Sequence, residues 1–428
     1  MGSLHIGSFL WKVRLILINA LVFAGVYGVL ELSYSTYAYF FRDASPYSYL
    51  VVEHPGQTVR FDPDRGFFLT ETPSRMARIT HGRVEYVGAF RGNAQGFADR
   101  DDFTIRRANP GEVRVGVFGD SFTTATFEPS NFPNWPSRAE DLGRADGEPL
   151  TLLNFGLDGG GLANWASVMR NIVVKDKYDL DGLVIAVAWD DLDRKFAMFE
   201  QTDPKTFAYA QAPSWDVNSQ PRTESEADAL LRKHPLRNHY VLSPAQFDAA
   251  LSGKWKPRQW RFRIFDRAQG VLSEVSNNFN KSQEPSSVFV PGQITLMKDI
   301  RRMADQNSLP IVVVYIPFRE ELLDPHYPSR VERTRQFAQI LGATFVDGRD
   351  VFRGLSPEQI RDLWYPNDGH WNHLGSSRFA EFMAHRIPDW VGPNKSRTAT
   401  ISGAGNSQNL HEVTLARFSP RKQSHPAN

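Results

Sequence analysis

The stretch VRVGVFGDSFTT, residues 113–124, decides how the rest of this sequence is interpreted. Its first half is rich in valine and stops at a Gly-Asp-Ser turn, which predicts a short strand buried on both faces. A helix is expected to begin just after the turn, with Ser121 near its N-terminus, where free backbone N–H groups favour negative charge. Open α/β folds place their sites at this carboxyl edge of the sheet. Ser121 is thus either an exposed functional serine or a plain helix N-cap.

The composition of the chain limits the classes of function. The 49 Lys and Arg residues nearly balance the 48 Asp and Glu residues, and no long basic run occurs, which argues against a dedicated nucleic-acid-binding protein. The 428 residues include no cysteine, so disulfides, thiol catalysis and thiolate metal sites are excluded. The length allows two or three ordinary domains, or one large α/β domain with insertions.

The N-terminal sequence predicts a membrane anchor. Lys12 and Arg14 precede the apolar run LILINALVFAGVYGVL, residues 15–30, and aromatic residues follow it. The apolar span is near the ~20 residues that a transmembrane helix needs, and the basic flank predicts a cytoplasmic N-terminus. We therefore expect residues 1–41 to be a single-pass anchor in the inner (cytoplasmic) membrane, with the rest of the chain in the periplasm. A cleaved signal peptide is the alternative, although no A-x-A-like cleavage site follows the run.

Five apolar runs in the second part of the chain are separated by spacers of helix length. The runs are 113–118, 150–155, 183–188, 311–316 and 344–346, and helical patterns occur at 162–174, 294–306 and 376–386. Alternating strands and helices predict an α/β fold with a parallel sheet. The expected divisions are the anchor, an extracytoplasmic lead-in with short strands at 42–109, the α/β domain at 110–392 and a disordered tail at 393–428.

An insertion at about 196–290 interrupts this series of strands. It contains the aromatic and basic segment WKPRQWRFRIF at 255–265. Long segments of this kind are either functional or disordered. We therefore interpret the insertion either as a lid or substrate platform, or as a partly ordered surface excursion.

Three stretches at later strand ends offer partners for Ser121. The glycines of NFGLDGGG, residues 154–161, can present backbone N–H groups to an oxyanion, although an ordinary strand-to-helix turn is the alternative. The run AWDDLD, residues 188–193, can place a polar side chain opposite Ser121 or can simply cap a helix. In NDGHWNHLG, residues 367–375, His370 is a candidate general base whose tautomer Asp368 can hold.

A metal site is the alternative use of these polar residues. Its ligands would be Asp190, Asp191, Asp368, His370 and His373. Their spacing matches no compact metal motif, so we expect no metal.

Together these stretches resemble the SGNH/GDSL hydrolase superfamily over about residues 110–390, without the insertion. The resemblance implies a three-layer, flavodoxin-like α/β fold with Ser121 as nucleophile and a triad completed by Asp368 and His370. It also implies an oxyanion hole formed by the N–H groups of Ser121 and Gly159 and by the side chain of Asp190. The segment NAQGFAD, residues 93–99, resembles the sequence that precedes the catalytic domain in membrane-anchored members.

Two features depart from the family pattern. The family supplies an Asn amide where this chain has Asp190, and an ionised carboxylate cannot donate a hydrogen bond and would repel an oxyanion. Either Asp190 is protonated, or another donor replaces it, or the enzyme is weak. The Asp-x-His-Trp spacing at 368–371 resembles the polysaccharide O-acetyltransferase branch, whose anchored extracytoplasmic proteins acetylate exopolysaccharides.

The sequence therefore predicts an exported serine esterase or O-acyltransferase that forms an acyl-enzyme on Ser121. The expected substrate is an acylated polysaccharide or a small ester, with a membrane-bound acyl donor as a possible partner and no cofactor. Trp189 and Trp371 are candidate stacking surfaces for sugar rings, with burial in the core as the alternative for both. The rival functions are a catalytically inactive polysaccharide-binding or assembly protein and a lipid or thioester hydrolase.

Overall fold

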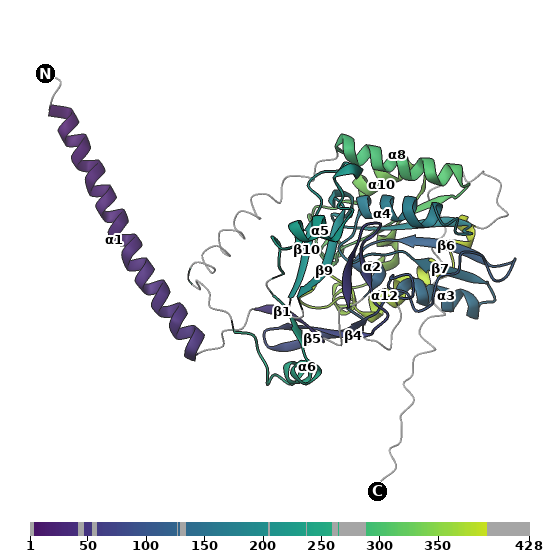
Figure 1. Ribbon diagram of the computed structural model, residues 1–428, viewed down its shortest axis with the longest axis horizontal. Helices are drawn as coiled ribbons and strands as arrows, with labels where there is room; N and C mark the ends of the chain where they lie inside the picture. Colours follow the sequence, from purple (N-terminus) through teal and green to yellow (C-terminus); the bar gives the residue numbers. More distant parts are fainter. Residues whose placement is uncertain are drawn as a thin grey trace, which may run out of the picture. The chain divides into compact units, whose positions relative to one another are not determined.

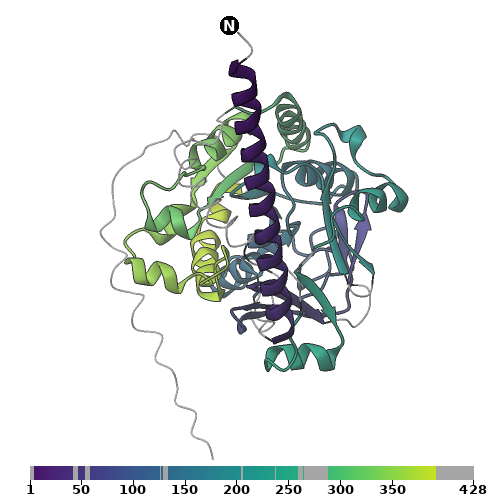
Figure 2. The ribbon, with the colours of Figure 1, turned by 90° about the vertical axis from the view of Figure 1, so that its left-hand side faces the viewer.

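The computed structural model describes residues 4–41, 47–53, 58–125, 127–128, 134–203, 206–236, 238–258, 264 and 288–391 (Figure 1). The tail predicted at 393–428 and most of the aromatic and basic segment 255–265 lie outside the described residues. The predicted apolar helix at the N-terminus is present as α1, Leu4–Phe41, which is unbroken in Figures 1 and 2. Its stretch Val13–Phe41 is long and apolar enough to cross a membrane.

A five-stranded sheet forms the centre of the α/β fold. Its strands are β6 (Val113–Phe118), β7 (Leu150–Asn154), β8 (Gly182–Ala188), β12 (Ile311–Ile316) and β13 (Thr344–Asp347). The spatial order is β13-β12-β8-β6-β7, and all neighbouring pairs are parallel. Counted along the chain, this is the 2-1-3-4-5 order of flavodoxin-like folds. The prediction of a parallel α/β sheet is confirmed, and each strand starts and ends within one residue of its predicted bounds.

Helices cover both faces of this sheet. Alternate residues of β8 enter two different apolar cores, Leu183 and Ile185 on one side and Val184 and Ala186 on the other. The first face carries α4 (Leu162–Val168) with its π-helical continuation Met169–Val174, α8 (Pro291–Gln306) and α10 (Val331–Leu341). The second face carries α3 (Trp135–Ala145), α12 (His373–Ala384) and α13 (Ile387–Val391). Figure 1 shows α4, α8 and α10 above the sheet and α3 and α12 below it, so the predicted three layers are present.

The lead-in and the insertion together build a second, four-stranded sheet, which we call the accessory sheet. Its order is β11-β1-β4-β5. The strands are β1 (Ser48–Glu53), β4 (Ser74–Thr80) and β5 (Arg83–Phe90) from the lead-in and β11 (His239–Leu242) from the insertion. Because β11 pairs with β1 in parallel, the insertion is joined to the lead-in by backbone hydrogen bonds.

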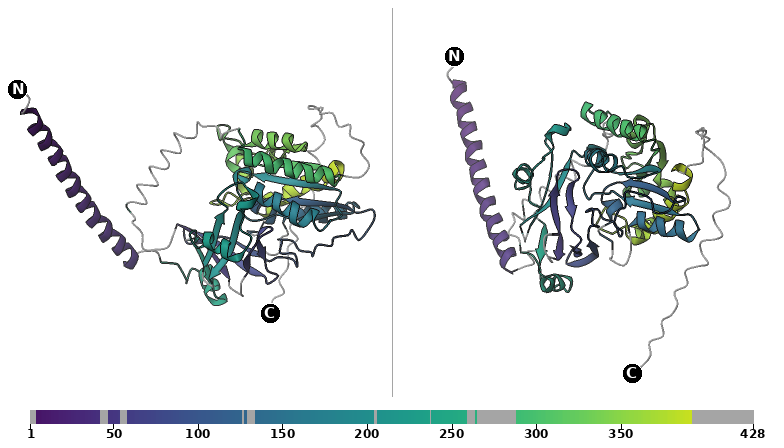
Figure 3. Two further views of the ribbon diagram at one scale, coloured as in Figure 1. Left: turned by 45° about the horizontal axis from the view of Figure 1, so that its top comes forward. Right: turned by 45° about the vertical axis from the view of Figure 1, so that its right-hand side comes forward.

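The described part of the insertion is a layer of the fold and not a surface excursion. It contains the hairpin of β9 (Ala197–Asp203) and β10 (Thr206–Gln211), and the helices α5 (Glu224–Leu231) and α6 (Pro244–Leu251). Phe247 of α6 is fully buried with Tyr49 and Val51 of β1. The views of Figure 3 show β9, β10 and the accessory sheet beside the central sheet.

Short elements complete the described chain. They are the hairpin of β2 (Val59–Asp62) and β3 (Gly66–Leu69), helices α2 (Ser121–Thr124), α9 (Arg319–Leu323) and α11 (Pro357–Asp362), and 3-10 turns at Asp191–Asp193, Val217–Ser219 and Gly348–Phe352.

Candidate active site

Ser121 is positioned by the sharp turn between β6 and α2. The N-cap of α2 is Asp120, whose Oδ1 accepts the backbone N–H of Phe122 at 2.9 Å. Ser121 is therefore the first helical residue and not the cap, which leaves its hydroxyl available to other partners. The turn requires Gly119, because a Cβ there would come within 2.0 Å of the Thr123 hydroxyl oxygen.

A histidine and an aspartate from the loop before α12 meet Ser121. The Nε2 atom of His370 lies 2.7 Å from Oγ of Ser121, and its Nδ1 lies 2.5 Å from Oδ1 of Asp368. Oδ1 of Asp368 also accepts the backbone N–H of His370 at 3.1 Å, which fixes the ring relative to the carboxylate. An imidazole held between a hydroxyl and a buried carboxylate is placed to take the hydroxyl proton. The structure thus brings the three predicted triad residues together.

The carboxylate of Asp368 is kept in its ionised form. Burial alone would raise its pKa, but the hydrogen bond and charge of His370, together with the charge of Arg78, lower the pKa of Asp368 well below its usual range. Nη1 of Arg78 lies 2.6 Å from Oδ2 of Asp368. An ionised carboxylate at this point stabilises the imidazolium that forms when the histidine takes a proton. No sequence motif marks Arg78, so its place beside Asp368 could not be predicted from the sequence.

Gly159 lies in the loop after β7 and faces the same cavity as Ser121. Its φ of +65° is in the left-handed region, which favours glycine. Its carbonyl oxygen accepts the hydroxyl of Tyr209, from β10, at 3.0 Å. Ser121 and Gly159, whose N–H groups are the predicted oxyanion donors, therefore line one cavity, and the catalytic role of these N–H groups stays a prediction.

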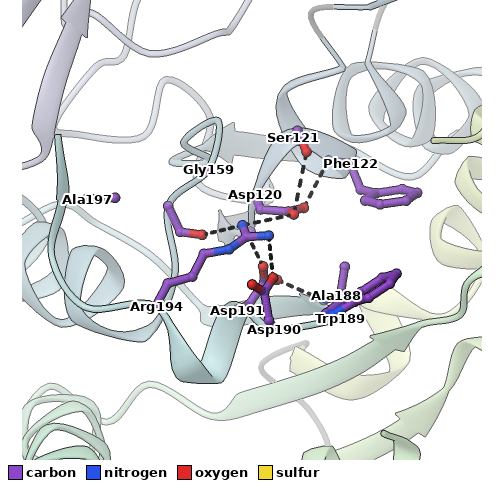
Figure 4. A network of polar contacts seen from close by, with 12 residues as sticks. Asp120, Ser121, Phe122, Gly159, Ala188, Trp189, Asp190, Asp191, Arg194 and Ala197 are labelled. Carbon is purple, nitrogen blue, oxygen red and sulfur yellow. Dashed lines mark hydrogen bonds and ion pairs between the residues drawn. The ribbon is translucent and has the colours of Figure 1, made fainter. Parts of the chain in front are cut away.

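Asp190 does not fit its predicted place in the oxyanion hole. Its Oδ1 accepts a hydrogen bond from Nη2 of Arg194 at 2.6 Å, and it does not line the cavity around Ser121. Figure 4 shows the guanidinium of Arg194 between Asp120 and the pair Asp190 and Asp191. A carboxylate paired with a guanidinium has no proton to donate to an oxyanion. Asp190 is therefore part of an ion-pair network with Arg194 and is not the predicted oxyanion donor.

Arg194 links the loops that follow three neighbouring strands. Its Nη1 lies 3.3 Å from Oδ2 of Asp120 after β6 and 2.9 Å from Oδ1 of Asp191 after β8, and it donates to the carbonyl of Gly160 after β7 at 3.0 Å. Asp191 is fully buried. Burial and the charge of Asp120 raise the pKa of Asp191, whereas Arg194 opposes this shift. The network fixes the glycine loop relative to Ser121, and the i,i+4 spacing of Asp190 and Arg194 is the sequence signal that could have revealed it.

The segment NAQGFAD, residues 93–99, binds the end of β7, from which the loop with Gly159 begins. Oδ2 of Asp99 accepts a hydrogen bond from the backbone N–H of Asn154 at 3.0 Å. The carbonyl oxygen of Ala98 accepts one from the side-chain amide of Asn154 at 2.9 Å. The amide oxygen of Asn154 accepts the N–H of Gly156 at 2.9 Å. Burial raises the pKa of Asp99 to about 6. This chain of contacts holds the strand end that carries Gly159.

A cavity of about 290 Å³ opens at Ser121 and His370. Its walls are mainly apolar and come from the accessory sheet, the hairpin of β9 and β10, and the segment before β11: Leu50, Val52, Met76, Phe199, Phe207 and Leu236. Such a cavity favours a hydrocarbon group bound next to the serine.

The two tryptophans proposed as stacking surfaces lie elsewhere. Trp371 is fully buried, with its ring centroid 4.8 Å from that of Phe122 and 5.0 Å from that of Phe379, so it cannot offer a face to a sugar ring. Trp189 is 41% exposed and packs edge-on against Phe318, outside the cavity lining.

Within the part of the chain that the structure describes, no group of three or more His, Asp or Glu side chains is placed to hold a metal ion. The residues considered as metal ligands instead bind other side chains: Asp190 and Asp191 pair with Arg194, and Asp368 pairs with His370.

Comparison with known proteins gives structural similarity alone. No protein-family model and no curated protein matches the chain. Similar solved structures include TesA, at 10% identity and a TM-score of 0.33 over 65% of this chain and 99% of that chain. They also include a psychrotrophic esterase from Pseudoalteromonas sp. (9%, TM-score 0.32, 65% and 98%) and an acetyl xylan esterase from Geobacillus stearothermophilus (13%, TM-score 0.34, 67% and 99%). At these identities and TM-scores the similarity by itself assigns neither a family nor an activity to this chain.

Proposed function

We propose that this protein is an SGNH-type serine esterase or O-acyltransferase that forms an acyl-enzyme on Ser121. The observation that carries the proposal is the continuous line of contacts from Ser121 through His370 to Asp368, at 2.7 and 2.5 Å. It lies at the carboxyl edge of a sheet with flavodoxin-like strand order, where doubly wound folds place their sites.

In the proposed reaction, Oγ of Ser121 attacks the ester carbonyl carbon while Nε2 of His370 takes the hydroxyl proton. The oxyanion accepts hydrogen bonds from the N–H groups of Ser121 and Gly159. The intermediate collapses, the C–O bond to the alcohol breaks, and His370 returns the proton to that alcohol. His370 then takes a proton from water or from an acceptor hydroxyl, whose oxygen attacks the acyl carbon. The bond between this carbon and Oγ of Ser121 breaks, and His370 returns the proton to Oγ. Asp368 stays ionised throughout.

The proposed substrate is an acyl ester, above all an acetyl ester, of an exported polysaccharide. The Asp-x-His-Trp spacing at 368–371 and its resemblance to polysaccharide O-acetyltransferases support this choice. The length and apolar composition of helix α1 support a single-pass anchor. The basic residues Lys12 and Arg14 before its apolar run support a cytoplasmic N-terminus, so the proposed site lies in the periplasm, and the proposed partner is a membrane-bound acyl donor. Transfer and hydrolysis use the same residues and differ only in the nucleophile that enters second.

A lipid or thioester hydrolase is the second candidate, and one observation favours it. The apolar lining of the cavity suits a longer acyl chain better than an acetyl group followed by a sugar. The two candidates share the acyl-enzyme and differ in the chain length that they prefer.

Mass spectrometry of the full chain in detergent tests the acyl-enzyme. After a brief pulse of p-nitrophenyl acetate, we expect a mass increase of one acetyl group on the peptide that contains Ser121. Ser121→Ala should lose the adduct, the turnover of p-nitrophenyl acetate and the labelling by a fluorophosphonate. Ser214→Ala, at an exposed serine, is the matched control.

Undiminished labelling of the Ser121→Ala variant would remove Ser121 as nucleophile. A wild-type chain that turns over no ester and yet binds acetylated glycan would instead identify an inactive polysaccharide-binding protein.

A further inference from the structure

The accessory sheet contributes a charged side chain to the acid of the triad. Nη1 of Arg78, on β4, donates to Oδ2 of Asp368 at 2.6 Å, and Nη2 lies 3.5 Å from the carbonyl oxygen of Asn367. The two residues are 290 positions apart in the chain. We propose that Arg78 is a positioning residue of the active site, which holds the Asp368 carboxylate ionised and oriented toward His370. This inference rests on the proposed function.

The carboxylate uses its two oxygens for two different tasks. Oδ1 of Asp368 accepts from the ring and the backbone of His370, and Oδ2 accepts from Arg78. The Asp368 side chain is only 4% exposed, so an oxygen left without a partner would carry the full cost of desolvation. Arg78 therefore keeps the second oxygen satisfied without competing for the histidine.

A β-bulge aims Arg78 and its neighbour Glu85 at the loop that carries the triad. In the β4–β5 pair, Arg78 lies opposite Tyr86 but Ile79 lies opposite Val84, so Glu85 is the extra residue. Bulges of this kind redirect side chains and are common beside active sites. Oε1 of Glu85 accepts the backbone N–H of Asn367 at 2.5 Å, and its Oε2 lies 3.7 Å from Nε of Arg78. The two side chains thus hold the backbone and the carboxylate of the same loop.

One row of residues across the accessory sheet forms a wall of the active-site cavity. His239, Leu50, Arg78 and Tyr86 are successive register partners on β11, β1, β4 and β5, and all four line the cavity. Burial and the charge of Arg78 lower the pKa of His239 to about 4, so His239 is neutral at pH 7. The cation of this row is therefore Arg78. The titratable and charged groups that face the Asp368–His370 pair are Arg78, Glu85, Tyr86, Asp158, His239 and Tyr365.

Two substitutions separate charge from geometry. Arg78→Met removes the charge and both hydrogen bonds at similar side-chain length. We expect kcat to fall about 10- to 100-fold with KM nearly unchanged. Residues that orient metal-binding histidines through a hydrogen bond cause losses of this size when they are removed, and Arg78 orients the partner of His370 in a similar way. The acid limb of kcat/KM should move to higher pH, because loss of a cation favours proton uptake by the coupled Asp368–His370 pair. Arg78→Lys should keep the acid limb near that of the wild type and recover part of kcat.

Arg75 supplies a matched control on the same strand. Its guanidinium pairs with Glu53 at 2.6 Å and with Asp248 at 3.1 Å, and it does not line the cavity. Arg75→Met therefore removes a comparable ion pair, and we expect kcat and the acid limb to stay as in the wild type. The proposal is overturned if Arg78→Met lowers kcat no more than Arg75→Met at equal thermal stability, or if the acid limb does not move.

A spectroscopic measurement keeps this test apart from that of the proposed function. In the full chain with labelled histidines, the titration midpoint of the His370 ring resonances should shift upward in Arg78→Met and not in Arg75→Met. If the wild type turns over no ester but this shift is seen, the proposed function fails and the role of Arg78 stands. An unchanged midpoint removes the role of Arg78 on its own.

Discussion

The Nε2 atom of His370 lies 2.7 Å from Oγ of Ser121, although 249 positions separate the two residues. Two aromatic rings pack against the imidazole and hold it in this position. The imidazole ring centroid lies 4.8 Å from that of Phe122 and 4.4 Å from that of Phe127. The histidine is therefore in place before any substrate binds, which is what efficient proton transfer requires.

The ionised Asp368 should matter more for turnover than for binding. Asp368→Asn keeps the size of the side chain but removes the charge, and its amide can face the imidazole as a donor, which stabilises the wrong tautomer. We expect kcat with p-nitrophenyl acetate to fall by about 10³–10⁴ at little change in KM. His385→Ala, at an exposed histidine, is the control and should retain activity. Near-normal kcat in Asp368→Asn would contradict the proposed triad.

Arg194 should contribute to stability because it neutralises a buried carboxylate. Arg194→Gln leaves Asp191, which is fully buried, without its cation. We expect the free energy of unfolding to fall by about 3–5 kcal/mol in urea denaturation. The double variant Arg194→Gln with Asp191→Asn should recover part of this loss. Equal stabilities of the single and double variants would show that the charge of Asp191 is not the reason for the loss.

Asp190 should be dispensable for catalysis, because its half-exposed carboxylate serves Arg194 and does not line the cavity. We expect Asp190→Asn to hold kcat/KM with p-nitrophenyl acetate, since the amide oxygen of Asn can still accept the hydrogen bond from Arg194. A loss of tenfold or more would show that the carboxylate has a catalytic role that this geometry does not explain.

Because the cavity is apolar, the dependence of kcat/KM on the length of the acyl chain should distinguish the two candidate substrate classes. If the acyl group occupies the cavity, each methylene should contribute about 0.8 kcal/mol, or roughly fourfold in kcat/KM, in the series from p-nitrophenyl acetate to octanoate. Met76→Trp, which fills part of the cavity, should then shift the preference to shorter chains. Acetate preference in both proteins would favour the acetyl-polysaccharide candidate over the lipid or thioester hydrolase.

Asp99 should make the stability of the fold depend on pH. Its pKa in the folded protein is raised to about 6 by burial, above the unfolded value of about 3.9. Its contribution is therefore complete below pH 4 and is lost as the pH rises through about 6. Asp99→Asn keeps an acceptor for the N–H of Asn154 but loses the acceptor for the N–H of Asp101, so between pH 4 and pH 8 we expect its stability relative to the wild type to rise by at most about 2–3 kcal/mol. Asp350→Asn is the exposed control, and a difference that does not change with pH would contradict the shift.

The central sheet was predictable because its strands are buried on both faces. The valine-rich runs of β6 and β12 have no helical period, and their bounds match the prediction. Strand β4 was missed because its sequence SRMARIT carries two arginines that bind acidic side chains across the sheet or in the catalytic loop. Its pairing partners β1 and β5 both lie in the lead-in, but Asp368, which binds Arg78, is 290 positions away, and a local pattern in the sequence cannot reveal such a contact.

Some residues of the candidate site were likewise predictable from the sequence, and others were not. Gly-Asp-Ser at 119–121 and Asp-Gly-His at 368–370 stand at strand or helix ends, where a short motif indicates the chemistry. Arg78 acts through a tertiary contact and belongs to no motif, and Arg194 is marked in the sequence only by its spacing from Asp190. The sequence also placed Asp190 by its motif position, whereas the partner that determines its role is four residues further along a 3-10 turn.

The start of the accessory sheet limits where an anchored form of this protein can work. Helix α1 ends at Phe41 and β1 begins at Ser48, so seven residue steps join them and span at most about 25 Å. Strand β1 itself supplies Leu50 and Val52 to the cavity wall. If α1 is retained in the bilayer, this tether keeps Leu50 and Val52, and with them the cavity that contains Ser121, close to the membrane surface.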